Sequence, residues 1–137
     1  MKLCSACLLG VKCRYDGQAK PDEKVLKLAR EEVLVPVCPE QLGGLPTPRR
    51  PQEIRGKRVL TDLEDDVTLQ FEKGAEETLH IAKLYDIKEA VLKQKSPSCG
   101  VGKIHDGTFS DRVVKGDGIT TALLKKNGII VISEEDL

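Results

Sequence analysis

Short runs of aliphatic residues alternate along the chain with segments in which apolar residues recur every three or four positions. The aliphatic runs predict strands, because a strand buried on both faces of a parallel sheet is almost continuously apolar. We expect strands at residues 2–7, 33–37, 90–92 and 129–132, with Pro36 removing one backbone donor from the second.

Segments with helical spacing lie between the predicted strands. One begins at about Pro21 and ends near Glu32. A second covers about residues 68–85, and its expected buried face follows steps of four and three: Phe71, Ala75, Thr78, Ala82 and Tyr85. A third covers residues 119–126 and stops before Gly128, which can take the left-handed conformation after a last turn.

Three segments lack a repeating apolar pattern. Residues 39–56 are rich in proline, glycine and arginine, which predicts a long ordered loop rather than a helix or strand. Residues 57–61 are expected to form a short edge strand. Residues 105–118 contain several turn signals and are expected to form a small hairpin or an irregular excursion.

The alternation of strands and helices predicts the fold class. Parallel strands need crossover connections, which helices commonly supply, so we expect a mainly parallel sheet with helices on its faces. A chain of 137 residues fits one compact domain. The predicted fold is α/β, a single three-layer, Rossmann-like domain spanning residues 1–137.

Composition and charge exclude several classes of partner. The 22 basic residues balance the 22 acidic ones, so no net field attracts nucleic acid or an anionic membrane surface. Aromatic residues make up only 3%, which argues against a stacking platform for single strands. No apolar run approaches a membrane span, and the amino terminus does not resemble a signal peptide, so we expect a cytoplasmic protein. Nothing in the sequence indicates an oligomeric state.

Five cysteines are many for so short an intracellular chain, and their odd number fits a disulfide framework poorly. Cys7, Cys38 and Cys99 each lie at or after the carboxyl end of a predicted strand. Ligands of open α/β sheets gather beyond the carboxyl ends of the strands, so these three thiols are candidate ligands of one metal centre. The alternative is that each is a small buried hydrophobe. Cys4 and Cys13 are assigned no primary role.

Polar candidates accompany the cysteines. Glu40 follows Cys38 by two residues, where a carboxylate beside a metal centre can transfer protons, although a capping or solvated Glu is the simpler interpretation. Ser96 and Ser98 flank Pro97 and can hydrogen-bond a substrate, yet this composition is also typical of an ordinary turn.

Three charged residues are candidates for contacts with an anionic or polar substrate: Arg14, Asp16 and Arg49. A structural Arg–Asp pair is the alternative. His80 and His105 are not expected to be catalytic, because neither lies next to the cysteine loops in the sequence. The Gly43–Gly44 segment matches neither common phosphate-binding glycine motif.

Three blocks of the sequence resemble one bacterial family. They are residues 5–10 with 14–17 (SACLLG, RYDG), residues 38–40 with 44–46 and 48–49 (CPE, GLP, PR), and residues 95–100 (KSPSCG). In this order they are similar to the signature blocks of the family catalogued as domain of unknown function 523, which includes the thiouracil desulfidases. The similarity covers nearly the whole chain.

The resemblance implies a [4Fe-4S] cluster held by Cys7, Cys38 and Cys99, with one iron lacking a protein ligand. It implies an iron-sulfur desulfidase that takes sulfur from a thiolated heterocycle such as 2-thiouracil, without net electron transfer. The substrate sulfur would bind the open iron while water attacks the carbon. Glu40 would activate water or relay protons, and Ser96 and Ser98 would position the heterocycle or its leaving sulfur.

Two other functions remain open at this point. One is a sulfurtransferase that carries a persulfide on Cys99, and the other is a metal-binding module without catalytic activity. Family membership does not define the thiolated substrate.

Overall fold

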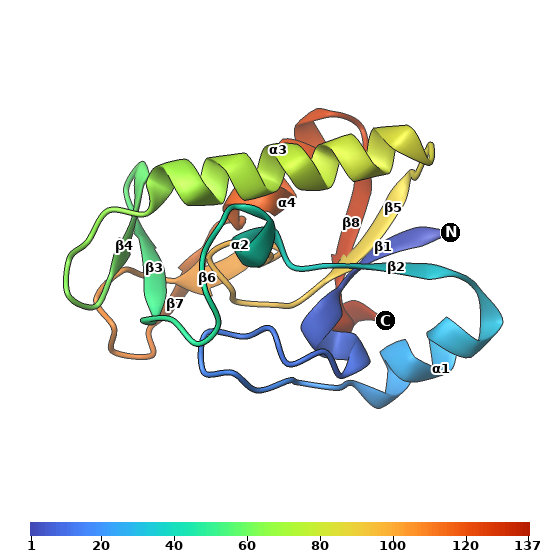
Figure 1. Ribbon diagram of the computed structural model, residues 1–137, viewed down its shortest axis with the longest axis horizontal. Helices are drawn as coiled ribbons and strands as arrows, with labels where there is room; N and C mark the ends of the chain where they lie inside the picture. Colours follow the sequence, from blue (N-terminus) through green and yellow to red (C-terminus); the bar gives the residue numbers. More distant parts are fainter.

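A four-stranded parallel sheet forms the centre of the computed structural model, which describes all residues 1–137 (Figure 1). Its strands are β1 (Lys2–Ser5), β2 (Leu34–Val37), β5 (Glu89–Leu92) and β8 (Ile130–Ser133), in the order β2-β1-β5-β8. Every neighbouring pair is parallel. The four predicted core strands are therefore confirmed, although β1 ends at Ser5 rather than residue 7.

Helices cover both faces of this sheet, as the alternation of side chains along β1 requires. Leu3 packs in a cluster with residues of α3 (Thr68–Leu84) and α4 (Ile119–Lys126), whereas Cys4 packs in a second cluster that contains Val25 of α1 (Glu23–Glu31). The predicted α/β architecture, with a parallel sheet between two helical layers, is confirmed (Figure 1).

The helices begin and end close to the predicted positions. Asp22 caps α1, because its carboxylate accepts hydrogen bonds from the backbone N–H groups of Lys24 and Val25. The buried face of α3 includes the first four residues of the predicted stripe. The prediction that the fifth residue, Tyr85, is buried is wrong, because Tyr85 follows the last turn of the helix and is 57% exposed.

The prediction of a loop over residues 39–56 is also wrong, since this segment contains a short helix and a strand. Cys38 and Pro39 begin a one-turn helix, α2 (Pro39–Leu42), in which proline at the first position costs no hydrogen bond. Residues Gln52–Arg55 form β3, which pairs antiparallel with β4 (Arg58–Thr61). Gly56 takes the positive φ that the tight connection needs. The edge strand expected at 57–61 is confirmed as β4.

A second hairpin, β6 (Lys103–His105) with β7 (Val113–Lys115), confirms the hairpin expected near residues 105–118. The carboxylate of Glu53 on β3 accepts hydrogen bonds from the backbone N–H groups of Gly107 and Phe109, which ties the two hairpins together. Figure 1 shows both hairpins beyond the end of the sheet toward which its strands run.

Two glycines bring α2 against α3 at backbone distance. A Cβ atom on Gly43 would lie 1.9 Å from the carbonyl oxygen of Gln70, and one on Gly74 would lie 1.8 Å from the carbonyl oxygen of Pro39. No other residue fits either position without separating the helices. This contact determines where the residues at the start of α2 lie.

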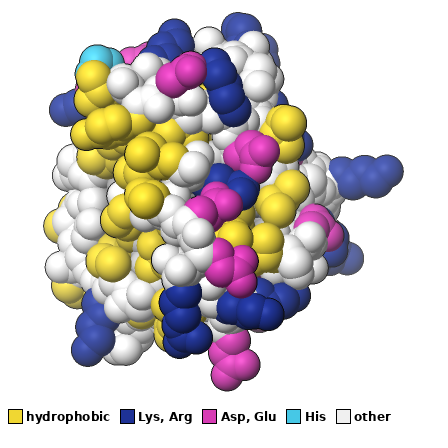
Figure 2. All heavy atoms as spheres, turned by 90° about the vertical axis from the view of Figure 1, so that its right-hand side faces the viewer, with side chains coloured by type: hydrophobic (Ala, Val, Ile, Leu, Met, Phe, Trp, Pro, Cys, Tyr) yellow, Lys and Arg dark blue, Asp and Glu magenta, His cyan; other side chains and the backbone are white.

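The opposite end of the molecule, where the strands begin, has a mixed surface. Figure 2 shows hydrophobic side chains beside lysine, arginine and acidic groups on this face. Exposed large apolar residues lie at or just before the first positions of the strands and at or just after the end of α3: Met1, Val33, Leu84, Tyr85 and Ile130. Among the helices, none is both long enough and apolar enough for a membrane crossing.

Candidate functional site

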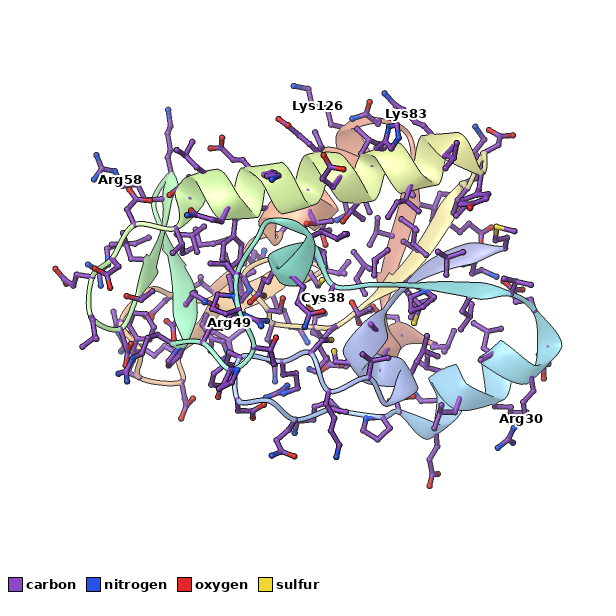
Figure 3. All side chains as sticks on the ribbon, viewed as in Figure 1. Arg30, Cys38, Arg49, Arg58, Lys83 and Lys126 are labelled. Atoms are coloured by element: carbon purple, nitrogen blue, oxygen red, sulfur yellow. The ribbon has the colours of Figure 1, made fainter.

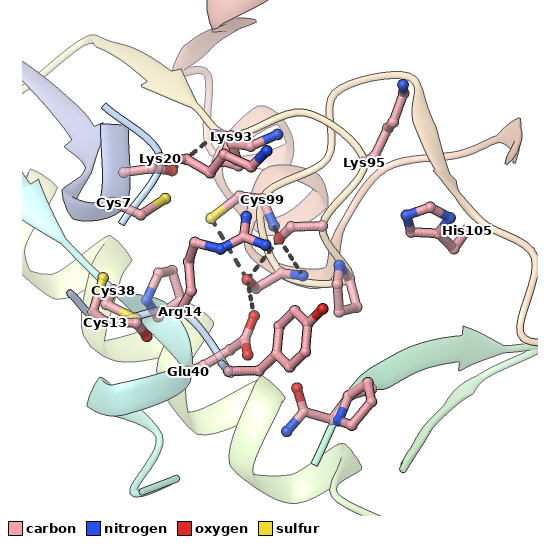
Figure 4. A pocket seen from close by; sticks show the side chains of 18 of the residues that line it. Cys7, Cys13, Arg14, Lys20, Cys38, Glu40, Lys93, Lys95, Cys99 and His105 are labelled. Carbon is pink, nitrogen blue, oxygen red and sulfur yellow. Dashed lines mark hydrogen bonds between the residues drawn. The ribbon is translucent and has the colours of Figure 1, made fainter. Parts of the chain in front are cut away.

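A cavity of about 570 Å³ lies at the carboxyl ends of the sheet strands, and residues of both hairpins contribute to its lining (Figure 4). Cys7 comes from η1 (Ala6–Leu9), the single turn after β1, and Cys38 comes from the residue before α2. Cys99 comes from the loop after β5. The topology therefore brings the three cysteines predicted from strand ends into one lining.

The other two cysteines differ from each other in position. Cys13 also lines the cavity, and its carbonyl oxygen accepts a hydrogen bond from the Cys38 thiol, with sulfur and oxygen 3.6 Å apart. Cys4 is fully buried in the apolar cluster on the α1 face and does not line the cavity. No primary role was predicted for Cys13, because its place beside Cys38 depends on the path of the loop between η1 and α1.

Three of the cavity thiols, those of Cys13, Cys38 and Cys99, have raised pKa values. Burial raises the pKa of Cys99 to about 11. A hydrogen bond with Cys13, followed by burial, raises the pKa of Cys38. For Cys13 a hydrogen bond with Cys38 lowers the pKa, but one with Cys7 and burial outweigh it and raise the value to about 11. Thiolates here would repel one another unless a cation compensated them.

The donor set fits an iron-sulfur cluster better than a single ion. Thiolates are soft ligands, which iron-sulfur clusters and zinc accept. No three His, Cys, Asp or Glu side chains lie close enough together to hold one metal ion. A cluster of several atoms needs thiols that surround a space larger than a single ion, and here three separate segments supply them. Ligation would also replace the thiol protons, which relieves the repulsion between thiolates.

Glu40 is buried at the first turn of α2, with only 8% of the residue exposed. Its Oε1 accepts a hydrogen bond from Nε of Arg49 at 3.0 Å and lies 2.9 Å from Nη2 of the same guanidinium, so the two side chains form an ion pair. Its Oε2 accepts a hydrogen bond from the Ser98 hydroxyl at 2.8 Å. A solvated loop carboxylate, the simpler interpretation of the sequence, does not describe this residue.

Arg49 is enclosed, with 4% of its side chain exposed. Figure 3 shows it inside the molecule near Cys38, whereas the labelled residues Arg30, Arg58, Lys83 and Lys126 project outward. Besides Glu40, the guanidinium donates to the carbonyl oxygens of Cys13 and Pro46 and to the hydroxyl of Thr47. Together with the bond to Glu40 these make four hydrogen bonds, which engage all three nitrogens of the guanidinium. The substrate contact expected at Arg49 from the sequence stays a prediction.

Ser96 and Ser98 form a short polar chain that leads to Glu40. Their hydroxyl oxygens are 3.0 Å apart, and Ser98 donates its proton to Glu40, so Ser96 is the donor between the two serines. The Ser96 oxygen also accepts hydrogen bonds from the backbone N–H groups of Ser98 and Cys99. Ser96 therefore stabilises the turn as well as lining the cavity.

Arg14 and Asp16 have different positions. Arg14 lines the cavity, while Asp16 is not among the lining residues. The Asp16 carboxylate accepts from Nε of Arg14 at 3.4 Å and from the backbone N–H of Gln18. This geometry is that of a structural Arg–Asp pair, the alternative that the sequence left open.

Sequence reasoning missed the residues that the hairpins and neighbouring loops add to the lining. They include two aromatic residues, three lysines and His105, which the sequence placed away from the cysteines: Tyr15, Phe109, Lys20, Lys93, Lys95 and His105. The local signals were the positions of Tyr15 beside Arg14 and of Lys95 beside Ser96. The hairpin residues reach the cavity because Glu53 holds the β6–β7 connection against β3.

Comparisons with known proteins find a matching family model, a similar solved structure and a similar sequence. The family model for 2-thiouracil desulfurase matches residues 3–136. A solved structure of a [4Fe-4S]-dependent thiouracil desulfidase, TudS, has a TM-score of 0.94 and 46% identity, over 99% of this chain and 91% of that chain. The uncharacterized protein YbbK of Bacillus subtilis (strain 168) is 44% identical over 100% of this chain and 97% of its own length.

Proposed function

The chain belongs to the 2-thiouracil desulfurase family, and we propose that it is a [4Fe-4S]-dependent desulfidase that removes sulfur from a thiolated heterocycle such as 2-thiouracil. The observation that carries this proposal is one cavity lined by Cys7, Cys38 and Cys99 and by the buried carboxylate of Glu40. The similarity to TudS supports it, because that protein is a [4Fe-4S]-dependent thiouracil desulfidase.

Cys7, Cys38 and Cys99 are the residues that would hold the cluster. When bound, a cluster with one iron free of protein ligands supplies a soft Lewis acid for the sulfur of a thiocarbonyl. The overall reaction converts the thiocarbonyl and water into a carbonyl and hydrogen sulfide. No electrons are transferred, so no second redox centre is required.

Glu40 accepts the proton of the attacking water in this proposal. The hydrogen bond and the ion pair with Arg49 keep Oε1 in place, and the Ser98 hydroxyl donates to Oε2. The chain from Ser96 through Ser98 offers a route by which a proton moves between the carboxylate and the heterocycle. These roles need a buried carboxylate of fixed direction, which the structure provides.

The remaining lining suits a small planar substrate. Tyr15 and Phe109 contribute aromatic surface, and two of the chain's four aromatic residues are therefore at this cavity. Its volume of about 570 Å³ lies within the range of about 300–1,000 Å³ common for small-molecule sites. A small thiolated molecule is accordingly the proposed substrate class.

Two alternatives explain less of the site. A persulfide sulfurtransferase needs a nucleophilic thiolate, but burial raises the pKa of Cys99 to about 11, which keeps this thiol protonated near neutral pH. A metal-binding module without activity needs no buried carboxylate beside the thiols. The placement of Glu40 therefore favours catalysis.

Anaerobic reconstitution with iron and sulfide tests the proposal. We expect a brown protein with about four irons per chain that converts 2-thiouracil into uracil and hydrogen sulfide, measured by chromatography and sulfide assay. A colourless protein that still transfers sulfur would favour the sulfurtransferase. A protein that binds zinc and has no activity would favour the metal-binding module.

A further inference from the structure

The first turn of α4 lies against the loop that carries Cys99. Backbone N–H groups at the start of this helix donate to carbonyl oxygens of the loop: Gly118 to Gly100 at 2.8 Å, Ile119 to Pro97 at 2.9 Å and Thr120 to Ser98 at 2.9 Å. The N–H groups that a helix leaves unpaired at its first turn are thus used by the cysteine loop. The loop and the helix form one unit.

Gly118 makes this close approach possible. A Cβ atom at this position would lie 2.4 Å from the carbonyl carbon of Ser98 and 2.6 Å from the backbone nitrogen of Cys99. These contacts are with backbone, which cannot move aside as a flexible side chain can. The position of the Cys99 backbone is therefore coupled to the start of α4.

Both peptide groups of Cys99 have side-chain partners. Its N–H donates to the hydroxyl oxygen of Ser96 at 2.8 Å, and its carbonyl oxygen accepts from the hydroxyl of Thr121 at 2.9 Å. Thr121 is fully buried, so no water replaces its hydroxyl. The direction of the Cys99 side chain depends on these two bonds, since they fix the peptide planes on either side of its Cα atom.

We propose that Thr121 is a positioning residue that holds Cys99 in the orientation needed to bind the cluster. The inference rests on the proposed function of the cavity but concerns a residue outside its lining. Residues that orient metal ligands commonly change metal affinity by about 10–100-fold when they are altered. Thr121 acts through the Cys99 backbone and contacts neither substrate nor cluster.

The neighbouring residue supplies a matched control. Thr120 is fully buried like Thr121, but its hydroxyl has no hydrogen-bond partner. Replacing Thr120 by valine keeps the branched shape and removes a hydroxyl that bonds to nothing. Thr78 supplies a second control, because its buried hydroxyl donates to the carbonyl oxygen of Gly74 at 2.7 Å within α3. Thr78→Val therefore removes a buried hydroxyl bond away from Cys99.

The experiment compares four variants: Thr121→Val, Thr121→Ser, Thr120→Val and Thr78→Val. In the reduced, cluster-free protein, the alkylation rate of Cys99 is measured by peptide mass spectrometry. In the reconstituted protein, iron loss to a chelator is followed at the cluster absorption band. We expect Thr121→Val to accelerate both, with iron loss faster by about tenfold. Thr121→Ser should restore the original rates because serine keeps the donor.

The outcomes separate the inference from the proposed function. If Thr121→Val matches the unsubstituted chain in both rates, or if Thr78→Val accelerates them equally, the positioning role is overturned. If the unsubstituted chain binds no cluster, the proposed function fails, and the alkylation rates still decide whether Thr121 orients Cys99. Unchanged rates in Thr120→Val together with faster rates in Thr121→Val support the inference.

Discussion

The hydroxyl of Ser98 donates to Oε2 of Glu40 over 2.8 Å, although 58 positions separate the two residues in the sequence. This bond joins the first turn of α2 to the loop after β5, so it links the segments that carry Cys38 and Cys99. Nε of Arg49 donates a hydrogen bond to the other carboxylate oxygen, Oε1. Both oxygens of Glu40 therefore have donors, which fixes the direction of a side chain that faces the cavity.

The first prediction concerns the charge of Glu40. Glu40→Gln keeps the shape of the side chain but cannot accept the proton of water, so turnover of 2-thiouracil should fall by about 10²-fold or more. The buried guanidinium of Arg49 also loses its counter-charge, and the free energy of unfolding should fall by about 1–3 kcal/mol. Steady-state kinetics and thermal unfolding measure the two effects.

Asp16→Asn is the control for this variant, because it removes a carboxylate that also pairs with an arginine but is itself outside the cavity lining. It should leave turnover within about twofold, as expected for a solvated pair. Undiminished turnover in Glu40→Gln would assign the proton transfer to water or another group.

The second prediction distinguishes positioning from substrate binding at Arg49. Arg49→Lys keeps one positive charge but cannot form the four hydrogen bonds in the fixed directions of a guanidinium. Because the existing bonds go to Glu40, Cys13, Pro46 and Thr47, kcat should fall by about tenfold or more through misplacement of Glu40. KM should change little. A large rise in KM with constant kcat would instead show a direct substrate contact.

The third prediction concerns the cluster ligands. Serine at position 7, 38 or 99 should abolish the visible absorption of the reconstituted protein, since a hydroxyl is a poor replacement for a thiolate on this type of cluster. Cys13→Ser is the strict control because Cys13 also lines the cavity. It should retain most of the iron, measured by a colorimetric assay. Equal iron loss from Cys13→Ser would mean that the ligand set includes Cys13.

Local patterns predicted the scaffold of this site because its determinants are local. The aliphatic run at residues 34–37 and the helical spacing from Phe71 to Ala82 each specify one element without help from distant residues. Once the strands are parallel, their carboxyl ends meet at one edge. The shared location of Cys38 and Cys99 then follows from topology.

The contacts within the site depend on longer paths and could not be predicted in this way. The polar sequence of β3 has no alternation, so its pairing with β4 depends on the turn at Gly56. His105 reaches the cavity only because the hairpins pack together. The bond between Glu40 and Arg49 requires the chain to reverse between two residues that are nine positions apart, which no periodicity encodes.

The fourth prediction is a loss of stability at high pH that depends on Cys4. Burial raises the pKa of this thiol from its usual 9.0 to about 12. Between these values the unfolded chain loses the proton while the folded chain keeps it, so stability falls as pH rises above about 9. Cys4→Ala should be less stable at pH 7 but should lose stability less steeply from pH 9 upward. Parallel curves of melting temperature against pH would contradict this assignment.

The last prediction tests how α3 determines the geometry of α2. A Cβ atom on Gly74 would lie 1.8 Å from the carbonyl oxygen of Pro39, so Gly74→Ala must push α2 away from α3. Overpacking of this kind costs about 1–3 kcal/mol, measured by urea unfolding. Because Cys38 and Glu40 flank Pro39, both should move relative to Cys99, and the variant should lose cluster and turnover together. Glu77→Ala, at an exposed position of the same helix, should affect neither. Full cluster content in a destabilised Gly74→Ala would show that the cysteines adapt to a displaced α2, and the close backbone contact would then serve stability alone.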